Sequence, residues 1–252
     1  MSERGRLRIV GLGPGGKDWV TPEASGWIAS ATDVIGYAPY LDRISLREGQ
    51  KRHASGNRAE MERARNALQL AEEGRQVALV SGGDPGVFAM AAAVFEAIDN
   101  GKPGWRALDI AVSPGISAMQ AVAARAGAPL GHDFCAISLS DNLKPWPLIE
   151  KRLSAAASAD FVIALYNPAS AARPRRIHDA FALLRNLKRA ATPVIFAHAA
   201  GQADEYILIE TLATADPCRA DMGTLIIIGS SATRVIARGI GTPFVYTSRR
   251  AD

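Results

Sequence analysis

The chain is poor in residues that bind metals: its 252 residues include 2 cysteines and 4 histidines. Cys135 and Cys218 lie far apart and match no metal-binding or redox spacing. The histidines are equally scattered, at His53, His132, His178 and His198. A four-cysteine metal cluster is therefore excluded, and we expect no metal site. Two unpaired thiols are typical of a reducing compartment.

Long hydrophobic runs are also missing. The most apolar stretch, Thr224–Gly229 (TLIIIG), is far shorter than the roughly 20 residues that span a bilayer. Met1–Val10 contains charges and has no apolar core of signal-peptide length. We therefore expect a soluble, cytoplasmic protein without a membrane partner.

Charge is only mildly unbalanced, with a formal net charge of +4. Such an excess fits an anionic ligand and also fits nucleic acid. Basic residues gather weakly at Arg173–Arg176 and Arg185–Arg189, where a solvated helix face is an equally good interpretation. Because aromatic residues make up 6% of the chain and form no RNA-reading motif, we expect no nucleic-acid partner.

The first half of the chain alternates short apolar runs with amphipathic stretches. Strands are predicted at Leu7–Leu12, Val34–Tyr37, Val77–Ser81 and Leu108–Ser113. Helices are predicted to begin at Thr21-Pro22, at Asn57 with Glu60 as a capping box and an end at Gly74, at Asp84-Pro85, and at Ile116 with an end near Gly127. This alternation predicts a parallel α/β sheet.

The pattern breaks at Gly127–Asp133 (GAPLGHD), which we interpret as a linker between domains 1–126 and 127–252. Further strands are predicted at Cys135–Leu139, Phe161–Tyr166, Val194–Ala197, Tyr206–Leu212 and Thr224–Gly229, with helices at Trp146–Ala157 and Pro174–Arg189. No helix separates the last strands, so the second sheet should be mixed. The expected fold class is α/β, with two α/β domains and a ligand cleft between them.

Residues 11–16 (GLGPGG) match the dinucleotide fingerprint G-x-G-x-x-G through Gly11, Gly13 and Gly16. A dinucleotide site also needs a helix starting at the third glycine and an acid about 20 residues further on. Here the helix start is late, at Thr21-Pro22, and no acid follows the next strand. An NAD-dependent oxidoreductase is therefore disfavoured, and a purely structural turn stays open.

Two more glycine loops follow predicted parallel strands: VSGGDP at residues 80–85 and SPGISA at residues 113–118. The three loops should meet at the carboxyl edge of one sheet, where α/β proteins bind ligands. They lack a P-loop lysine-serine pair, so a ligand without phosphates fits better. S-adenosylmethionine is one such ligand, and Asp84 could face its sulfonium or could simply cap a helix.

VSGGDPGVFAMA, GLGPGG, SPGISA and ALYNP together resemble the tetrapyrrole methylases, two-domain methyltransferases of cobalamin and siroheme synthesis, over nearly the whole chain. The segment His132–Trp146 and the YNP sequence at residues 166–168 are similar to the precorrin-3B carbon-17 methyltransferase branch. The chain departs from many relatives after GPG, where Gly16-Lys17 replaces an acid.

The resemblance implies the class III methyltransferase fold, S-adenosylmethionine as methyl donor and a tetrapyrrole as substrate. The implied reaction methylates carbon 17 of precorrin-3B with ring contraction, which gives precorrin-4 and S-adenosylhomocysteine. Since family members are commonly homodimers, the resemblance also implies a homodimer.

The resemblance and the loop positions nominate three groups of residues. The donor site should comprise Pro14, Gly82, Gly83, Asp84, Phe88, Ser117, Ala118, Tyr166 and Asn167. The substrate carboxylates should meet Tyr37, Tyr40, Lys51, Arg173 and Arg176. His198, which follows the strand VIFA, is the expected acid/base residue for ring contraction.

Other functions remain open on sequence alone. The chain could be a sibling methylase that acts on another precorrin, or on the cobalt-containing factor III of the anaerobic route. An RNA methylase with the same fold also remains possible, as does an NAD-dependent enzyme.

Overall fold

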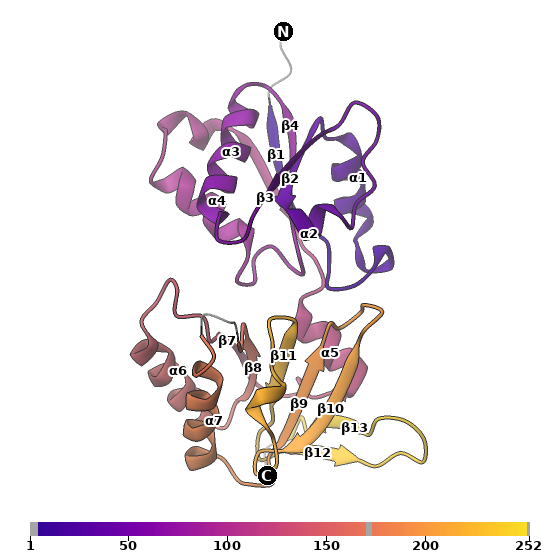
Figure 1. Ribbon diagram of the computed structural model, residues 1–252, viewed down its shortest axis with the longest axis vertical. Helices are drawn as coiled ribbons and strands as arrows, with labels where there is room; N and C mark the ends of the chain where they lie inside the picture. Colours follow the sequence, from indigo (N-terminus) through magenta and orange to yellow (C-terminus); the bar gives the residue numbers. More distant parts are fainter. Residues whose placement is uncertain (1–4, 170–172, 251–252) are drawn as a thin grey trace. The chain divides into compact units, whose positions relative to one another are not determined.

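The computed structural model describes residues 5–169 and 173–250 (Figure 1). Its internal contacts divide the chain into two units, Met1–Ala118 and Met119–Asp252. The division falls at the start of helix α5 (Ala118–Ala126), whereas the sequence placed a boundary after it. Helix α5 goes with the second unit because the Met119 amide donates to the Tyr166 hydroxyl and Arg125 pairs with Glu205.

The first unit is built on a five-stranded sheet with the strand order β3-β2-β4-β1-β5, in which every pair is parallel. Its strands are β1 (Arg6–Gly11), β2 (Asp33–Tyr37), β3 (Lys51–Ser55), β4 (Gln76–Ser81) and β5 (Asp109–Ser113). The predicted parallel sheet is therefore confirmed, and β3 is an additional edge strand that the sequence pattern did not indicate.

Helices cover both faces of this sheet (Figure 1). They are α1 (Pro22–Ser30), α2 (Ala38–Leu41), α3 (Glu60–Glu72) and α4 (Met90–Asp99), with short 3-10 helices η1 (Lys17–Trp19) and η2 (Pro103–Ala107). In β1, Leu7 and Ile9 pack toward α3 and α4, while Val10 faces α1 on the opposite side. Burial on both faces explains why the central strand β4 (QVALVS) is a nearly continuous apolar run rather than an alternating one.

Of the helix starts predicted in the first unit, the one at Thr21 is confirmed, whereas those at Asn57 and Asp84 are wrong. Thr21 does cap α1, since its hydroxyl accepts from the Ala24 amide. Asn57 does not cap α3: its side chain accepts only from Arg58, and the helix begins at Glu60. Asp84 does not cap α4, which begins at Met90, because both of its oxygens bind loop amides described below. Asn and Asp side chains stabilise such local turns as readily as helix ends.

The amino edge of the first sheet is held by the buried carboxylate of Asp33. It binds the Thr32 hydroxyl (2.7 Å), His53 of β3 (2.8 Å) and the Arg75 guanidinium (3.0 Å). Burial raises the pKa of Asp33, but these hydrogen bonds outweigh it and leave the pKa below its usual value. Lys51, the first residue of β3, pairs with Asp33 in the register and therefore lies at this same edge.

The second unit contains a mixed five-stranded sheet with the order β10-β9-β11-β8-β7. Its strands are β7 (Phe134–Ser138), β8 (Val162–Tyr166), β9 (Pro193–His198), β10 (Tyr206–Thr211) and β11 (Thr224–Ile228). Strands β7 and β8 are parallel, whereas β11 runs antiparallel to both β8 and β9. The predicted mixed sheet is confirmed. Helices α6 (Trp146–Ser158) and α7 (Arg176–Leu187) bury its main core, in which Phe181 stacks on Phe196.

The stretch interpreted as a linker pairs with the end of the chain. Strand β6 (Gly127–Ala128) forms a three-stranded sheet with β13 (Phe244–Thr247) and β12 (Thr233–Ile236). Gly127 has a φ of +128°, and a Cβ there would lie 2.6 Å from the Val245 carbonyl oxygen. A glycine is thus needed for this close pairing. The second unit also contains the short 3-10 helix η3 (Pro217–Arg219).

Candidate functional site

The three glycine loops lie side by side in the first unit. They follow β4, β1 and β5, which are adjacent in the sheet, so their carboxyl ends share one edge. Gly13 and Gly83 exchange two backbone hydrogen bonds, of 3.2 and 3.1 Å, and both have positive φ. The convergence predicted from the sequence is therefore present.

Two other glycines allow the loops to touch. A Cβ at Gly11 would lie 2.7 Å from the Gly115 Cα and from the Gly83 carbonyl oxygen. A Cβ at Gly115 would lie 2.2 Å from the same oxygen. Gly16, by contrast, has no other atom within 4 Å of its Cβ position. Gly11 and Gly115 are therefore required by backbone packing, and the last glycine of the fingerprint is not.

The surroundings of Gly16 differ from those of a dinucleotide loop. Gly16 precedes the short helix η1, and the first α-helix begins only at Pro22. Strand β2 ends at Tyr37 and runs into α2 (APYL), so no carboxylate follows it. The helix N-terminus and the ribose-binding acid of a dinucleotide site are both missing from their expected places.

Asp84 joins two of the loops. Its Oδ1 accepts from the Gly86 amide (2.7 Å) and its Oδ2 from the Gly115 amide (3.0 Å). Each carboxylate oxygen thus already has a backbone donor, one within its own loop and one in the loop after β5. This geometry assigns Asp84 to holding the loops in register.

The remaining first-unit residues of the predicted donor site surround these loops. Pro14 is half-buried in the loop after β1, and Ser117 is buried just before α5, where Ala118 begins the helix. Phe88 is unusual because it is 50% exposed and has a φ of +52°. A bulky residue rarely adopts this conformation, and such strain is concentrated at functional sites.

The predicted substrate residues of the first unit lie at two different edges. Tyr37 and Tyr40 form an edge-to-face pair with ring centroids 5.3 Å apart. Tyr40 covers Gly82, where a Cβ would lie 2.6 Å from its Cζ, and burial raises the pKa of its hydroxyl. Lys51 lies at the amino edge of the sheet, away from the glycine loops. The structure therefore brings the two tyrosines to the loops but not Lys51.

Sequence reasoning missed Arg43, which follows α2. Its Nη2 donates to the carbonyl oxygens of Leu12 (3.0 Å) and Gly13 (3.0 Å) and to that of Gly15. Proline at the start of APYL could have indicated a short helix, which would have placed a basic residue at its end. No local pattern could have indicated that this residue reaches back to residues 12–15.

In the second unit, Tyr166 and Asn167 stand at the carboxyl end of β8. The Tyr166 hydroxyl accepts from the Met119 amide (3.1 Å) in the first turn of α5. Asn167 has a φ of +51°, and its Nδ2 donates to the Ser138 hydroxyl (2.9 Å) at the end of β7. Both residues are therefore held in place by neighbouring elements of their own unit.

Arg173 and Arg176 share one carboxylate beyond the end of β7. The Arg176 Nε donates to Asp141 (2.8 Å), and the Arg173 Nε lies 3.8 Å from the other oxygen of that carboxylate. The Arg173 Nη1 also donates to the Leu139 carbonyl (3.1 Å), and the Arg176 guanidinium lies 4.7 Å from the Trp146 ring centroid. The hydrogen bond to Asp141 raises the pKa of Arg176. The Arg176 Nη1 also lies 3.4 Å from Asp179, so the two arginines share two carboxylates.

His198 ends β9, which runs in the same direction as β8 since both are antiparallel to β11. His198 consequently lies at the same sheet edge as Tyr166. Its Nδ1 is 3.1 Å from Asp221, and its Nε2 is 3.4 Å from Asp204. Burial raises the pKa of Asp221, but hydrogen bonds from Thr224 and His198 outweigh it and lower the pKa overall. His198 therefore has a carboxylate beside each of its ring nitrogens.

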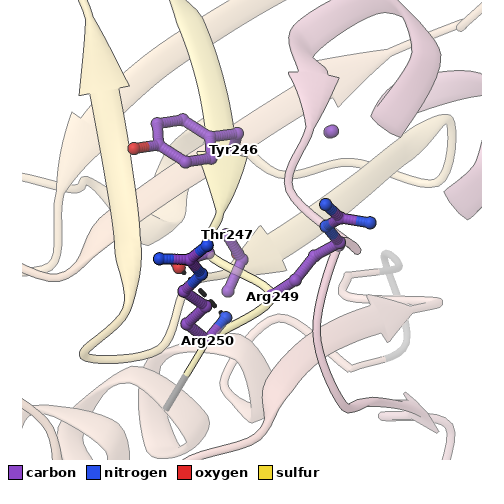
Figure 2. Close-up of a pocket in the computed structure, with 7 residues that line it drawn as sticks. Tyr246, Thr247, Arg249 and Arg250 are labelled. Carbon is purple, nitrogen blue, oxygen red and sulfur yellow. Dashed lines mark hydrogen bonds between the residues drawn. The ribbon is translucent and has the colours of Figure 1, made fainter. Parts of the chain in front are cut away.

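A cavity of about 550 Å³ lies elsewhere in the second unit (Figure 2). It is lined by Ala128, Gly131, Tyr246, Thr247, Ser248, Arg249 and Arg250, none of which was predicted as a site residue.

Within residues 5–169 and 173–250, no three His, Cys, Asp or Glu side chains are grouped to hold a metal ion. Over the same residues, no helix is long and apolar enough to cross a membrane.

The first unit has the arrangement by which parallel α/β proteins bind small ligands, with glycine-rich backbone at the carboxyl edge of the sheet. Residues 6–216 match the family model of the Tetrapyrrole (Corrin/Porphyrin) Methylases, and the chain belongs to this family. The resemblance inferred from the loop motifs is therefore confirmed.

Individual relatives match over nearly their whole length. A precorrin-3B C(17)-methyltransferase from Sinorhizobium sp is 56% identical over 97% of this chain and 96% of its own. A probable cobalt-factor III C(17)-methyltransferase from Salmonella typhimurium is 42% identical, covering 96% of this chain and 99% of its own. The crystal structure of the methyltransferase CobJ superposes with a TM-score of 0.91 at 48% identity, covering 97% of this chain and 100% of CobJ.

Proposed function

We propose that the chain is an S-adenosylmethionine-dependent methyltransferase that methylates carbon 17 of precorrin-3B, with ring contraction to precorrin-4, in cobalamin biosynthesis. The observation that carries this proposal is the 56% identity, over almost the full length of both chains, to a precorrin-3B C(17)-methyltransferase. The converged glycine loops supply a place for the donor in the first unit.

The loops fit a donor without phosphates. Gly83 has only the Ile116 carbonyl near its Cβ position, at 3.9 Å, so a ligand can approach the backbone there. The half-exposed ring of Phe88 offers apolar surface beside the same loop. We assign Pro14, Gly82, Gly83, Phe88, Ser117 and Ala118 to the donor, together with Tyr166 and Asn167. Asp84 takes the supporting role that its two amide contacts indicate.

S-adenosylmethionine supplies a methyl group already activated on a sulfonium, so positioning can provide much of the acceleration. The chain's part is then to fix the loop backbone and to align the ring carbon that is methylated. This fits a site built from glycine backbone and aromatic side chains.

For the carboxylates of a tetrapyrrole, we propose Arg173 and Arg176 in the second unit and Tyr37 and Tyr40 in the first. The arginines share Asp141, and Arg176 also pairs with the half-exposed Asp179, so a substrate carboxylate would compete with these side chains for the guanidinium groups. Planar guanidinium groups suit bidentate binding of carboxylates. Lys51 is left out of this group because it lies at the opposite edge of the first sheet.

For the proton transfers of ring contraction, we propose His198. Asp221 orients its Nδ1, and stacking on Tyr206, with centroids 5.3 Å apart, fixes the ring plane. Its Nε2 meets only the largely exposed Asp204, which a substrate group could displace. Replacement of His198 by alanine should therefore reduce ring contraction. Wild-type turnover in that variant would remove His198 from the mechanism.

The deciding experiment incubates the protein with precorrin-3B and isotopically labelled S-adenosylmethionine and identifies the product by mass and NMR. A parallel incubation uses cobalt-factor III, because a relative named for that substrate is 42% identical. Label at carbon 17 of a contracted ring is expected with precorrin-3B. Turnover of cobalt-factor III alone would assign the chain to the anaerobic reaction. Calorimetric binding of NAD but not S-adenosylhomocysteine would refute methyl transfer.

We also propose that the enzyme is a cytoplasmic homodimer. Exposed apolar side chains on β12 and β13 favour self-association: Val235 is 46%, Ile236 50% and Phe244 45% exposed. Light scattering should give twice the chain mass. A monomer at micromolar concentration would contradict the dimer without affecting the proposed reaction.

A further inference from the structure

Arg43 makes an unusual set of contacts with the loop after β1. A single nitrogen of its guanidinium, Nη2, donates to the carbonyl oxygens of Leu12, Gly13 and Gly15. Three carbonyl dipoles of one short segment thus point toward one cation. Without that cation, the partial negative charges of these oxygens would repel one another.

Glycines make the loop intrinsically mobile, so its contacts decide its shape. Gly13 has a φ of +62°, and Gly15 and Gly16 add further freedom, so the free loop has many conformations. Its partners on the other side are the Gly83 backbone, through the two bonds from Gly13, and the Ser81 carbonyl, through the Leu12 amide. Beyond Gly13, the Gly16 carbonyl accepts from the Trp19 amide, and Arg43 is the side chain that binds the carbonyls on both sides of Pro14, those of Gly13 and Gly15.

We infer that Arg43 is a positioning residue, which holds the GLGPGG loop in the conformation that binds the methyl donor. The inference rests on the proposed function, because it assumes that this loop contacts the donor. Arg43 reaches the loop from the end of α2, the segment that also places Tyr40 over Gly82. One short helix thus fixes two of the three glycine loops.

The role predicts a particular pattern of defects. If Arg43 only orders the loop, its loss should weaken donor binding while chemistry at saturating donor stays nearly unchanged. Hydrogen bonds to charged groups are strong enough that losing this set should weaken binding about tenfold or more. Lysine can place an ammonium near the same oxygens but lacks the planar guanidinium, so it should restore binding only in part.

The experiment measures S-adenosylhomocysteine binding by calorimetry for wild type, Arg43→Ala, Arg43→Lys and the control Arg47→Ala. Arg47 lies in the same segment and is exposed, and in the described structure only its backbone is hydrogen-bonded, with both bonds going to Gln50. We expect the affinity of Arg43→Ala to fall at least tenfold, that of Arg43→Lys to be intermediate, and Arg47→Ala to match wild type. Because Arg43 is exposed, millimolar guanidinium should restore part of the affinity of Arg43→Ala. Steady-state rates should show a raised KM for the donor with kcat within about threefold of wild type.

Each outcome decides between the two proposals. Failure of wild type to bind S-adenosylhomocysteine would refute the proposed function. Wild-type binding with unchanged affinity in Arg43→Ala would refute only the role of Arg43. A fall in kcat at saturating donor, or no recovery with lysine or guanidinium, would also overturn a positioning role. If Arg43→Ala does not fold, Arg43→Lys decides, since unchanged KM and unchanged affinity in that variant would contradict the inference.

Discussion

Alanine substitution at the two ends of GLGPGG should have opposite consequences, although both positions belong to the same fingerprint. At Gly11, a Cβ would lie 2.7 Å from backbone atoms of Gly115 and Gly83, which belong to the two neighbouring loops. Backbone held by the sheet cannot yield as a flexible side chain can. Such overpacking typically costs about 1–3 kcal/mol. For a chain of this size, each kcal/mol lowers Tm by roughly 2–4 °C.

At Gly16 the same added methyl group meets nothing within 4 Å. The backbone there is extended, with φ −73° and ψ −172°, a conformation that alanine adopts readily. Gly16→Ala should therefore change stability by less than about 0.5 kcal/mol, or raise it slightly by reducing the freedom of the unfolded chain.

The assay is thermal and urea-induced unfolding of both variants, followed by titration with S-adenosylhomocysteine. We expect Gly11→Ala to lower Tm by roughly 2–12 °C and to weaken ligand binding, while Gly16→Ala matches wild type in both. In a dinucleotide loop the third glycine is needed for close packing of helix and strand. A Gly16→Ala variant as damaged as Gly11→Ala would therefore refute this reasoning about the loop.

Three further predictions concern single side chains. Since the pKa of Asp33 is lowered in the folded state, its contribution to stability is present above the unfolded value of about 3.9 and is lost as pH falls through the folded value. Asp33→Asn should thus cost roughly 1–3 kcal/mol at pH 7 and flatten the acid limb of the stability curve measured by urea unfolding. Tyr166→Phe removes the acceptor of the Met119 amide, so S-adenosylhomocysteine affinity should fall about 2- to 10-fold by calorimetry; unchanged affinity would argue against its place in the donor site. Arg173→Ala should weaken substrate binding more at low salt than at high salt if it pairs with a carboxylate, whereas Lys51→Ala should bind as wild type does.

Most strands could be predicted because burial on both faces forces an unbroken apolar run. Val77–Ser81 is such a run, whereas in β1 Arg8 interrupts the buried residues Leu7, Ile9 and Val10; a glycine loop follows each strand. The convergence of the three glycine loops at the carboxyl edge of the sheet could be predicted from the parallel arrangement of the strands. Strand β12 could not be found in this way, because Val235 and Ile236 are exposed and carry no alternating pattern.

Polar residues were harder to assign because the same side chain can serve several local structures. Asp84 precedes proline, as a helix cap often does, yet its second oxygen binds the amide of Gly115, which is distant in sequence. Lys51 was assigned to the site as a loop residue, but strand β3, which the sequence pattern did not indicate, begins there and puts Lys51 at the edge opposite the glycine loops. Arg43 gives no local signal at all, since its partners lie across the fold.

The fingerprint itself illustrates why residue letters do not define a ligand. Gly11 is needed to let β1 approach the loops after β4 and β5, and Gly13 is needed for its positive φ and its bonds to Gly83. The close approach at Gly11 and the positive φ at Gly13 are both needed because three loops converge here. A dinucleotide-binding loop does not need such a convergence. Gly16 meets neither demand, and the helix that would need it starts only at Pro22. Gly11 and Gly13 are thus explained by how the loops contact one another, whereas at Gly83 the backbone stays open, with a single atom within 4 Å of its Cβ position, the Ile116 carbonyl oxygen.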